Sequence, residues 1–135
     1  MSATIVIDVR GLSAGYGGVA AIRDIDLQVG TGEVVALLGP NGAGKTTTLL
    51  ALSGLIGALA GTVSMLGRPV DTRSPHRQAR HGLAHVAEDR SLFFELTVRE
   101  NLRLGLSGSR GRRSAATDRV VELLPALSRL MDRRA

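Results

Sequence analysis

The sequence reads Gly39-Pro40-Asn41-Gly42-Ala43-Gly44-Lys45-Thr46-Thr47 at the end of its first third, and this stretch fills every defined position of the pattern G-x-x-x-x-G-K-[ST]. The apolar run 34–38 precedes it, and the residues 48–52, which favour a helix, follow it. A buried strand, a glycine-rich turn and a helix are therefore expected in this order. That context distinguishes a phosphate-binding loop from a chance glycine-rich turn before a helix.

Each residue type in this stretch suits a contact with phosphate. Glycine lets the backbone turn so that successive N–H groups point inward, and the helix adds its free N–H groups and the positive end of its dipole. Lys45, the only lysine among seventeen basic residues, is expected to reach the terminal phosphates, and the hydroxyl of Thr46 to hold Mg²⁺. All nine residues 39–47 are therefore predicted to bind nucleotide.

The composition is typical of one globular domain. The 135 residues suffice for a single core, 44% of them are hydrophobic, and no apolar run approaches the length of a membrane span. No signal peptide is expected, because Met1–Thr4 has no charged region before an apolar one. The absence of cysteine excludes a disulfide framework and a thiolate metal site. The three histidines, at positions 76, 81 and 85, show no ligand-like pairing and are interpreted as structural.

The net charge of +5 is concentrated in the second half of the chain. Up to Gly67 there are three basic and four acidic residues, whereas the remainder holds fourteen basic and eight acidic ones. A basic half is compatible with nucleic acid or an anionic membrane surface. Aromatic residues are only 2% of the chain, so stacking platforms for single strands are nearly absent. A solvated, arginine-rich surface is favoured, and no nucleic-acid partner is expected.

Strand and turn signals precede the loop. Thr4–Arg10 is rich in β-branched residues and is predicted to form a strand, and the four glycines of Gly11–Gly18 predict a turn or loop. Ala20–Val29 alternates apolar and polar residues, which indicates a half-buried antiparallel strand. Glu33–Leu38 is predicted to be the buried strand that leads into the loop.

Shorter elements are expected after the loop. The helix is predicted to run from Lys45 to Ser53 and to end at Gly54. Gly61–Gly67 is predicted to be a strand, Pro75–His81 a short helix, and Leu83–Val86 a short buried strand.

The last third is predicted to be helical. Thr97 and Glu100 form a capping box, which starts a helix that ends at Gly105. Ser107–Ser114 is basic, of low complexity and expected to be mobile, and Ala115–Arg134 has the apolar spacing of an amphipathic helix that Pro125 kinks or splits.

Taken together, these motifs resemble the first part of the ATPase of an ATP-binding cassette (ABC) transporter. The loop 39–47 has the sequence that is usual in that family. Gly15-Tyr16-Gly17 resembles the segment whose aromatic ring stacks on adenine. The alternative for Tyr16 is a tyrosine that only occupies a turn. The stretches 86–90, 92–94 and 96–102 resemble the loop that couples nucleotide to the membrane subunits. The resemblance implies an α/β fold, a P-loop NTPase of the ABC type with an N-terminal antiparallel β-subdomain, truncated before the signature motif.

The resemblance also implies a division of the chain into four parts. Residues 1–32 would supply strands of the antiparallel subdomain, and residues 33–67 the strand before the loop, the helix and the following strand. Residues 68–105 would hold a connector and the coupling-loop region, and residues 106–135 would begin the helical subdomain.

The sequence of the coupling-loop region resembles that of the subfamily that imports branched-chain amino acids and related amides. Glu88 stands where most cassettes have a glutamine that helps to hold Mg²⁺ and the attacking water; a solvated acidic turn is the alternative for Glu88. Ala87 and Asp89 replace the usual proline and glycine, so the geometry of this turn is left open. Val121–Pro125 and Asp132–Arg134 resemble the helix that precedes the signature motif.

Several motifs of a complete cassette are absent from these 135 residues. No run of four aliphatic residues ends in Asp-Glu, the motif L-S-G-G-Q is missing, and no switch histidine is found; Ile5–Asp8 and Leu106–Ser109 are only superficial matches. No catalytic residue is assigned beyond Lys45 as a phosphate contact and Glu88 as a coupling-loop residue. We therefore expect ATP and Mg²⁺ to bind, and hydrolysis by this chain alone to be negligible.

The family resemblance implies partners and a location. A second cassette and membrane permease subunits, contacted through Glu88–Leu102, would assemble with the chain on the cytoplasmic face of the membrane. The strand ending at Leu38 would pair with strands later in the chain, so unpaired edges, exposed apolar surface, and poor solubility or dimerisation are expected here. The alternatives are a soluble cassette acting in translation or repair, and a non-catalytic nucleotide-binding fragment; a basic nucleic-acid binder is disfavoured.

Overall fold

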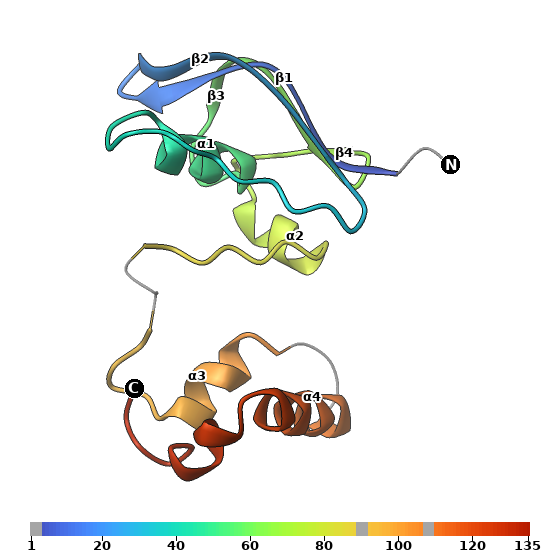
Figure 1. The fold of residues 1–135 in the computed structure, drawn as a ribbon, viewed down its shortest axis with the longest axis vertical. Helices are drawn as coiled ribbons and strands as arrows, with labels where there is room; N and C mark the ends of the chain where they lie inside the picture. Colours follow the sequence, from blue (N-terminus) through green and yellow to red (C-terminus); the bar gives the residue numbers. More distant parts are fainter. Residues whose placement is uncertain (1–3, 89–91, 107–109) are drawn as a thin grey trace. The chain divides into compact units, whose positions relative to one another are not determined.

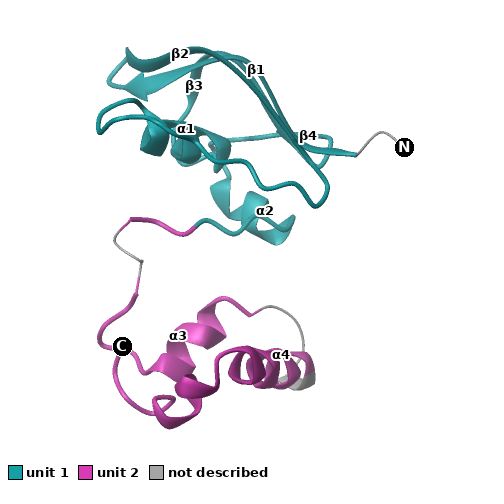
Figure 2. Cartoon of the chain, in the orientation of Figure 1, with its two compact units in different colours: residues 1–85 teal, residues 86–135 magenta. Residues whose placement is uncertain are grey.

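The computed structural model describes residues 4–88, 92–106 and 110–135 (Figure 1). The chain divides into two compact units, Met1–His85 and Val86–Ala135, which Figure 2 distinguishes by colour. The first unit contains the sheet and the glycine-rich loop, and the second is helical. None of the helices in the described part of the chain is long and apolar enough to cross a membrane.

The first unit is built on a four-stranded antiparallel sheet. Its strands are β1 (Ile5–Tyr16), β2 (Val19–Gly30), β3 (Ala58–Met65) and β4 (Arg68–Pro69), in the spatial order β2-β1-β3-β4. The long central strand β1 pairs with both β2 and β3. The predicted alternating strand Ala20–Val29 is confirmed as most of β2, whereas the two-residue strand β4 was not predicted.

The predicted loop over Gly11–Gly18 is wrong, because β1 continues through it to Tyr16. The pairing shifts register between Val9 and Leu12, and Gly11 adopts a positive φ of 57° there while its N–H donates to Asp26 Oδ1 at 2.7 Å. A side chain on Gly15 would collide with the backbone of β2. These glycines allow close approach of neighbouring strands, and only Gly17 and Gly18, with φ of 56° and 81°, form the hairpin turn.

The helix after the loop, α1 (Lys45–Leu52), is confirmed in place and extent. Ser53 caps its C-terminus, and Gly54 follows with a φ of 72°, as a residue just past a helix end commonly does. Ala51 and Leu52 are buried and complete the core of the unit. The other buried side chains of this core come from the sheet: Val9, Leu12, Ala14, Ile22 and Val63.

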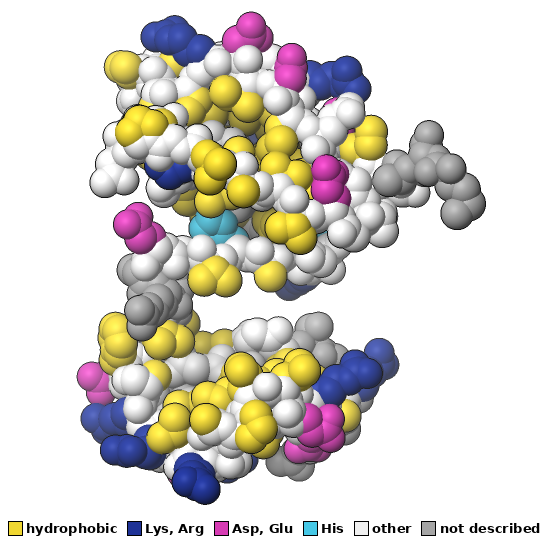
Figure 3. Space-filling view, viewed as in Figure 1, with side chains coloured by type: hydrophobic (Ala, Val, Ile, Leu, Met, Phe, Trp, Pro, Cys, Tyr) yellow, Lys and Arg dark blue, Asp and Glu magenta, His cyan; other side chains and the backbone are white. Residues whose placement is uncertain are grey.

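The predicted buried strand Glu33–Leu38 is wrong. The segment forms no strand, and Val34 and Leu38 are 95% and 90% exposed. The physical reason is that no described segment offers these residues a hydrogen-bonded strand partner, and strand structure requires one. The exposure of apolar side chains that we expected at this segment is confirmed, and hydrophobic side chains gather on the visible face of the first unit (Figure 3).

The remainder of the first unit is a connector with one short helix. Helix α2 (Pro75–Arg80) begins after Ser74, close to the predicted bounds. The predicted strand over Leu83–Val86 is wrong, for the same lack of a partner strand among the described residues. His85 and His81 have structural contacts, since His85 Nδ1 lies 2.8 Å from the buried Ser53 Oγ and His81 Nε2 lies 3.0 Å from Arg68 Nη1.

The second unit comprises α3 (Val98–Leu104), α4 (Arg110–Leu123) and the 3-10 helix η1 (Pro125–Arg129). The predicted amphipathic helix thus begins earlier than Ala115, and Pro125 splits it as expected. Of the low-complexity stretch, residues 107–109 lie outside the described residues, whereas residues 110–114 are helical. The chain end returns to α3, where the N–H of Val98 donates to the carbonyl of Arg133 at 2.9 Å.

The predicted capping box at the start of α3 is confirmed. The N–H of Glu100 donates to Thr97 Oγ1 at 3.2 Å, and the N–H of Thr97 donates to Glu100 Oε2 at 2.8 Å. The Thr97 N–H, and the Thr97 hydroxyl that donates to the same Oε2 at 2.8 Å, hold the pKa of Glu100 below its ordinary value. Both backbone contacts satisfy donors that a helix N-terminus otherwise leaves unpaired.

This cap predicts an acid-dependent loss of stability in the second unit. Because the pKa of Glu100 is lowered on folding, its contribution is present above the unfolded glutamate pKa of about 4.3 and is lost as the pH falls through the folded value. Thr97→Ala should cost about 1 kcal/mol at neutral pH. Urea unfolding of the unchanged chain and of the Thr97→Ala variant, from pH 7 to pH 3, measures the free energy of unfolding and its dependence on pH. Ser128→Ala is the control. An equal acid dependence in the Thr97→Ala chain would rule out the cap as its source.

Candidate functional site

The glycine-rich loop lies between the extended segment 33–38 and α1, and it is anchored on the sheet through Gly44 (Figure 1). Gly44 is the N-cap of α1 and adopts a left-handed conformation, with φ 89° and ψ 8°. A Cβ atom placed on it would collide with Cγ2 of Ile22, a buried residue of β2. The start of α1 is therefore pressed directly against β2, a contact that the motif spacing alone does not reveal.

The loop ends in a series of backbone donors. The first hydrogen bond of α1 runs from the N–H of Thr48 to the carbonyl of Gly44 at 2.8 Å, and Thr48 Oγ1 donates to the same carbonyl at 2.9 Å. The N–H groups of residues 44–47 precede this bond and so have no partner within the helix. They share the positive end of the helix dipole, which favours an anion at this place.

Lys45 lies across the loop. Its Nζ donates to the carbonyl oxygens of Gly39, at 2.8 Å, and of Pro40, at 2.7 Å. The N–H of Ala43 donates to the carbonyl of Pro40 at 3.2 Å, which closes the turn beneath the ammonium group. The only lysine of the chain therefore holds its charge against the first two residues of the loop.

The two threonines after Lys45 face different ways. Thr46 is exposed, so its hydroxyl can reach a ligand, whereas Thr47 is 7% exposed and leaves mainly its backbone N–H for binding. Within the described residues no group of three or more His, Asp or Glu side chains could hold a metal ion by itself. The donor set suits Mg²⁺ bound jointly by Thr46, phosphate oxygens and water, which is how this ion commonly binds in nucleotide sites.

Tyr16 ends β1 at the hairpin turn, and its side chain is 54% exposed. Two residues before it in the same strand, Ala14 pairs with Ile22, the residue against which Gly44 packs. At a strand rise of about 3.4 Å per residue, Tyr16 lies about 7 Å along the strand from that point. The hairpin thus carries an exposed ring two residues beyond this contact, and the contact of Tyr16 with adenine stays a prediction.

Glu88 is exposed and belongs to the second unit, whereas Thr46 belongs to the first. Its role toward Mg²⁺ therefore stays a prediction. Asp89, one of the two replacements that leave the geometry of this turn open, lies outside the described residues.

The second unit contains an apolar groove that sequence reasoning missed. Its volume is about 410 Å³, and it is lined by Leu92, Phe93, Val98, Asn101, Leu102, Leu104, Leu127 and Ala135. Asn101 shapes it: Asn101 Oδ1 accepts from the N–H of Phe93 at 3.0 Å, and Asn101 Nδ2 donates to the carbonyl oxygens of Phe93 and Thr97 at 3.0 and 3.1 Å. An asparagine one residue after a capping box is the only sequence signal for this clamp.

Comparison with known proteins places these features in a family. The family model described as ABC transporter matches residues 22–135. The Nod factor export ATP-binding protein I of Cupriavidus pinatubonensis is 38% identical over 130 residues, covering 96% of this chain and 39% of the relative. The ribose import ATP-binding protein RbsA 1 of Rubrobacter xylanophilus is 37% identical over 136 residues, covering 96% of this chain and 27% of the relative.

A solved structure described as the ATP binding subunit of an ABC transporter matches with a TM-score of 0.81 and 32% identity, covering 96% of this chain and 54% of that one. The fold class is thereby confirmed as the N-terminal part of an ABC-type P-loop domain with its antiparallel sheet. The chain spans about two fifths of the length of the first curated relatives that it matches. Neither relative named above is described as a branched-chain amino acid importer.

Proposed function

Because the chain belongs to the ABC transporter family, we propose that it is the ATP-binding part of a transporter ATPase and that the loop 39–47 holds the phosphates of ATP together with Mg²⁺. The observation that carries this proposal is the arrangement at the start of α1. The Lys45 ammonium lies on the carbonyls of Gly39 and Pro40 within the loop. The loop ends at a left-handed Gly44, from which the N–H groups without a partner in α1 begin.

Binding requires an exchange of partners at Lys45. The ammonium would give up the carbonyls of Gly39 and Pro40 for terminal phosphate oxygens, which share a negative charge and accept stronger hydrogen bonds. The amides of residues 44–47 would hold the neighbouring phosphate oxygens, and Thr46 would orient Mg²⁺. The bound Mg²⁺ supplies neutralisation of phosphate charge.

Turnover is not part of what we propose for these 135 residues alone. They contain no Asp-Glu pair after an aliphatic run and no signature motif, so a second carboxylate for Mg²⁺ and a general base are missing from them. In a complete cassette pair these groups would come from other segments and from a second cassette. The chain by itself would bind nucleotide without hydrolysing it at a useful rate.

Tyr16 provides a built-in test of nucleotide binding, because the chain has one tyrosine and no tryptophan. If the ring stacks on adenine, MgATP should quench its fluorescence, and inorganic triphosphate, which has no base, should not. Tyr16→Leu should weaken MgATP binding by roughly fivefold to a hundredfold, since base stacking on an aromatic ring contributes about 1–3 kcal/mol. Calorimetry of this variant measures the loss.

The control for this test is Val19→Ala, which changes the exposed partner of Tyr16 across the hairpin and keeps the ring. An unquenched Tyr16 at saturating MgATP would show that the ring is only a turn residue. Failure of MgATP to bind at all would instead count against the loop itself.

The apolar groove supports contact with permease subunits through the region Glu88–Leu102, as the family resemblance implies. Leu104→Asp, placed in the groove, should abolish co-purification with the membrane subunits of the same transporter and leave MgATP affinity unchanged. Leu123→Asp is the matched control, because Leu123 is 78% exposed and lies outside the groove. Equal loss of assembly in both variants, or in neither, would exclude the groove as the docking site.

The transported substrate is the least constrained part of the proposal. We propose branched-chain amino acids or related amides because the sequence of residues 86–102 resembles that subfamily. The relatives described above are named for Nod factor export and ribose import. Uptake of labelled leucine and ribose by cells with and without the complete transporter distinguishes these classes. Loss of ribose uptake alone would refute the amino-acid assignment.

A further inference from the structure

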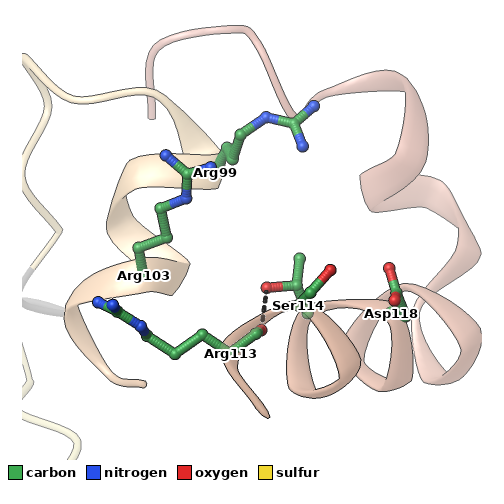
Figure 4. A pocket seen from close by; sticks show the side chains of 6 residues that line it. Arg99, Arg103, Arg113, Ser114 and Asp118 are labelled. Carbon is green, nitrogen blue, oxygen red and sulfur yellow. Dashed lines mark hydrogen bonds between the residues drawn. The ribbon is translucent and has the colours of Figure 1, made fainter. Parts of the chain in front are cut away.

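A second charged site lies in the helical unit, away from the glycine-rich loop in the sequence. Helices α3 and α4 line a pocket of about 510 Å³ (Figure 4). Its lining residues are Arg99, Arg103, Arg113, Ser114, Thr117 and Asp118. Apart from Arg99, which lies in the coupling-loop stretch 96–102, none of these residues belongs to a family motif or to the proposed nucleotide site.

Among the described residues that line it, three guanidinium groups and one carboxylate give the pocket an excess of positive charge. Arg99 is already engaged, because its Nε lies 3.0 Å from Asp132 Oδ1. Among the residues that the structure describes, Arg103 and Arg113 have no carboxylate oxygen within 4.0 Å. Glu100, whose pKa Arg103 helps to lower, is held by the capping box instead.

The two uncommitted arginines come from different helices. Figure 4 shows that Arg113 extends from α4 toward α3, which carries Arg103. The hydroxyl of Thr117 donates to the carbonyl of Arg113 at 3.0 Å, and Ser114 adds a second hydroxyl to the lining. Guanidinium forks match the planar pairs of oxygens on phosphate, so two forks from two helices suit this anion better than a single point charge.

We propose that this pocket binds a phosphate ester, with Arg103 and Arg113 as its principal ligands and Ser114 as an additional donor. The volume exceeds what a phosphate group alone requires, so the ester's organic part fits as well. The ester can come from a soluble metabolite or from the headgroup of an acidic phospholipid, since both present the same phosphate oxygens. Asp118, on the same wall, disfavours a second phosphate and so favours a monophosphate over a polyphosphate.

The test uses the Lys45→Ala form of the whole chain, so that the glycine-rich loop does not compete for phosphate. Glycerol 3-phosphate is titrated while the backbone amide resonances of residues 113–118 are followed by NMR. In parallel, sedimentation with phosphatidylglycerol vesicles is compared with phosphatidylcholine vesicles. We expect saturable shifts with glycerol 3-phosphate, binding to phosphatidylglycerol vesicles, or both. The experiment that gives a response shows whether the phosphate ester comes from a soluble metabolite or from a lipid headgroup.

The double variant Arg103→Gln/Arg113→Gln should weaken binding of the ligand that gave a response by at least about tenfold, because it removes two charge-assisted contacts. Arg129→Gln, on η1 and outside the pocket, should leave it unchanged. Arg103→Lys/Arg113→Lys keeps the charge and should weaken binding less than the glutamine pair, which separates loss of the site from loss of the fold. No response in either arm, or a response that survives in the glutamine pair, overturns the proposal.

Discussion

Replacing Lys45 with alanine is expected to lower the affinity for MgATP by roughly tenfold to a hundredfold while leaving the fold intact. The ammonium donates to two backbone carbonyls at 2.8 and 2.7 Å and would transfer these contacts to phosphate oxygens. A hydrogen bond between charged partners contributes about 1.5–3 kcal/mol, which sets the expected range. Isothermal calorimetry on both chains measures the difference, and circular dichroism reports the fold.

Two controls make the Lys45 result specific. Arg10→Ala removes one positive charge from the first unit at an exposed pair with Asp8, and it should leave MgATP affinity unchanged. Lys45→Arg should bind nearly as weakly as the alanine variant, since a planar guanidinium does not replace a compact ammonium inside the loop. An Arg10→Ala effect equal to that of Lys45→Ala would reduce the role of Lys45 to general electrostatics. Phosphate release that depends on Lys45 would contradict binding without turnover.

Replacing Gly44 with alanine is expected to destabilise the first unit by about 2–5 kcal/mol and to eliminate nucleotide binding. The residue has a φ of 89°, and a left-handed conformation costs a side-chain-bearing residue about 1–2 kcal/mol. The new Cβ would also collide with Ile22 in the core, and overpacking adds about 1–3 kcal/mol. Urea unfolding followed by circular dichroism measures the loss of stability.

The matched control is Gly42→Ala. Gly42 has a similar φ of 83°, but a Cβ there would meet no atom within 4 Å, so only the backbone cost of about 1–2 kcal/mol applies. Ile22→Ala removes the colliding methyl group, and in the Gly44→Ala background it should be less destabilising than alone. Equal losses in Gly42→Ala and Gly44→Ala, or strict additivity with Ile22→Ala, would show that the contact between loop and sheet is unimportant.

The parts of the fold that sequence predicted well are those controlled by neighbouring residues. The capping box at Thr97 acts over three residues, and α1 begins at Lys45 directly after a glycine that accepts a left-handed conformation. Pro125 ends α4 because it has no N–H to donate. These signals are complete within one helical turn, so they need no information about the rest of the molecule.

The wrong predictions concern strands, whose existence depends on distant partners. The segments Glu33–Leu38 and Leu83–Val86 have strand-like composition, yet no described strand pairs with either of them. The opposite error concerns β1, where the glycines of Gly11–Gly18 predict a loop and the structure has a strand as far as Tyr16. Gly15 instead permits the close passage of β2, and Gly11 accommodates a shift in register. Both errors arise because pairing is a tertiary property.

The candidate site shows the same division between local and distant information. The motif identified the residues of the loop, including the ammonium of Lys45 and the exposed hydroxyl of Thr46. It did not reveal that Gly44 packs on Ile22 or that Asn101 clamps the backbone at Phe93. These contacts join residues that are distant in sequence or lack a recognised spacing, and only the folded chain brings them together.

The central claim is that the phosphates of ATP bind at the N–H groups opening α1. Backbone amide NMR of the 135-residue chain during titration with MgATP, with adenosine as the reference, tests it most directly. We expect large, saturable shifts at residues 42–47 with MgATP, and none there with adenosine. Saturable MgATP binding that leaves these amides unshifted, or shifts them no more than adenosine does, would contradict it.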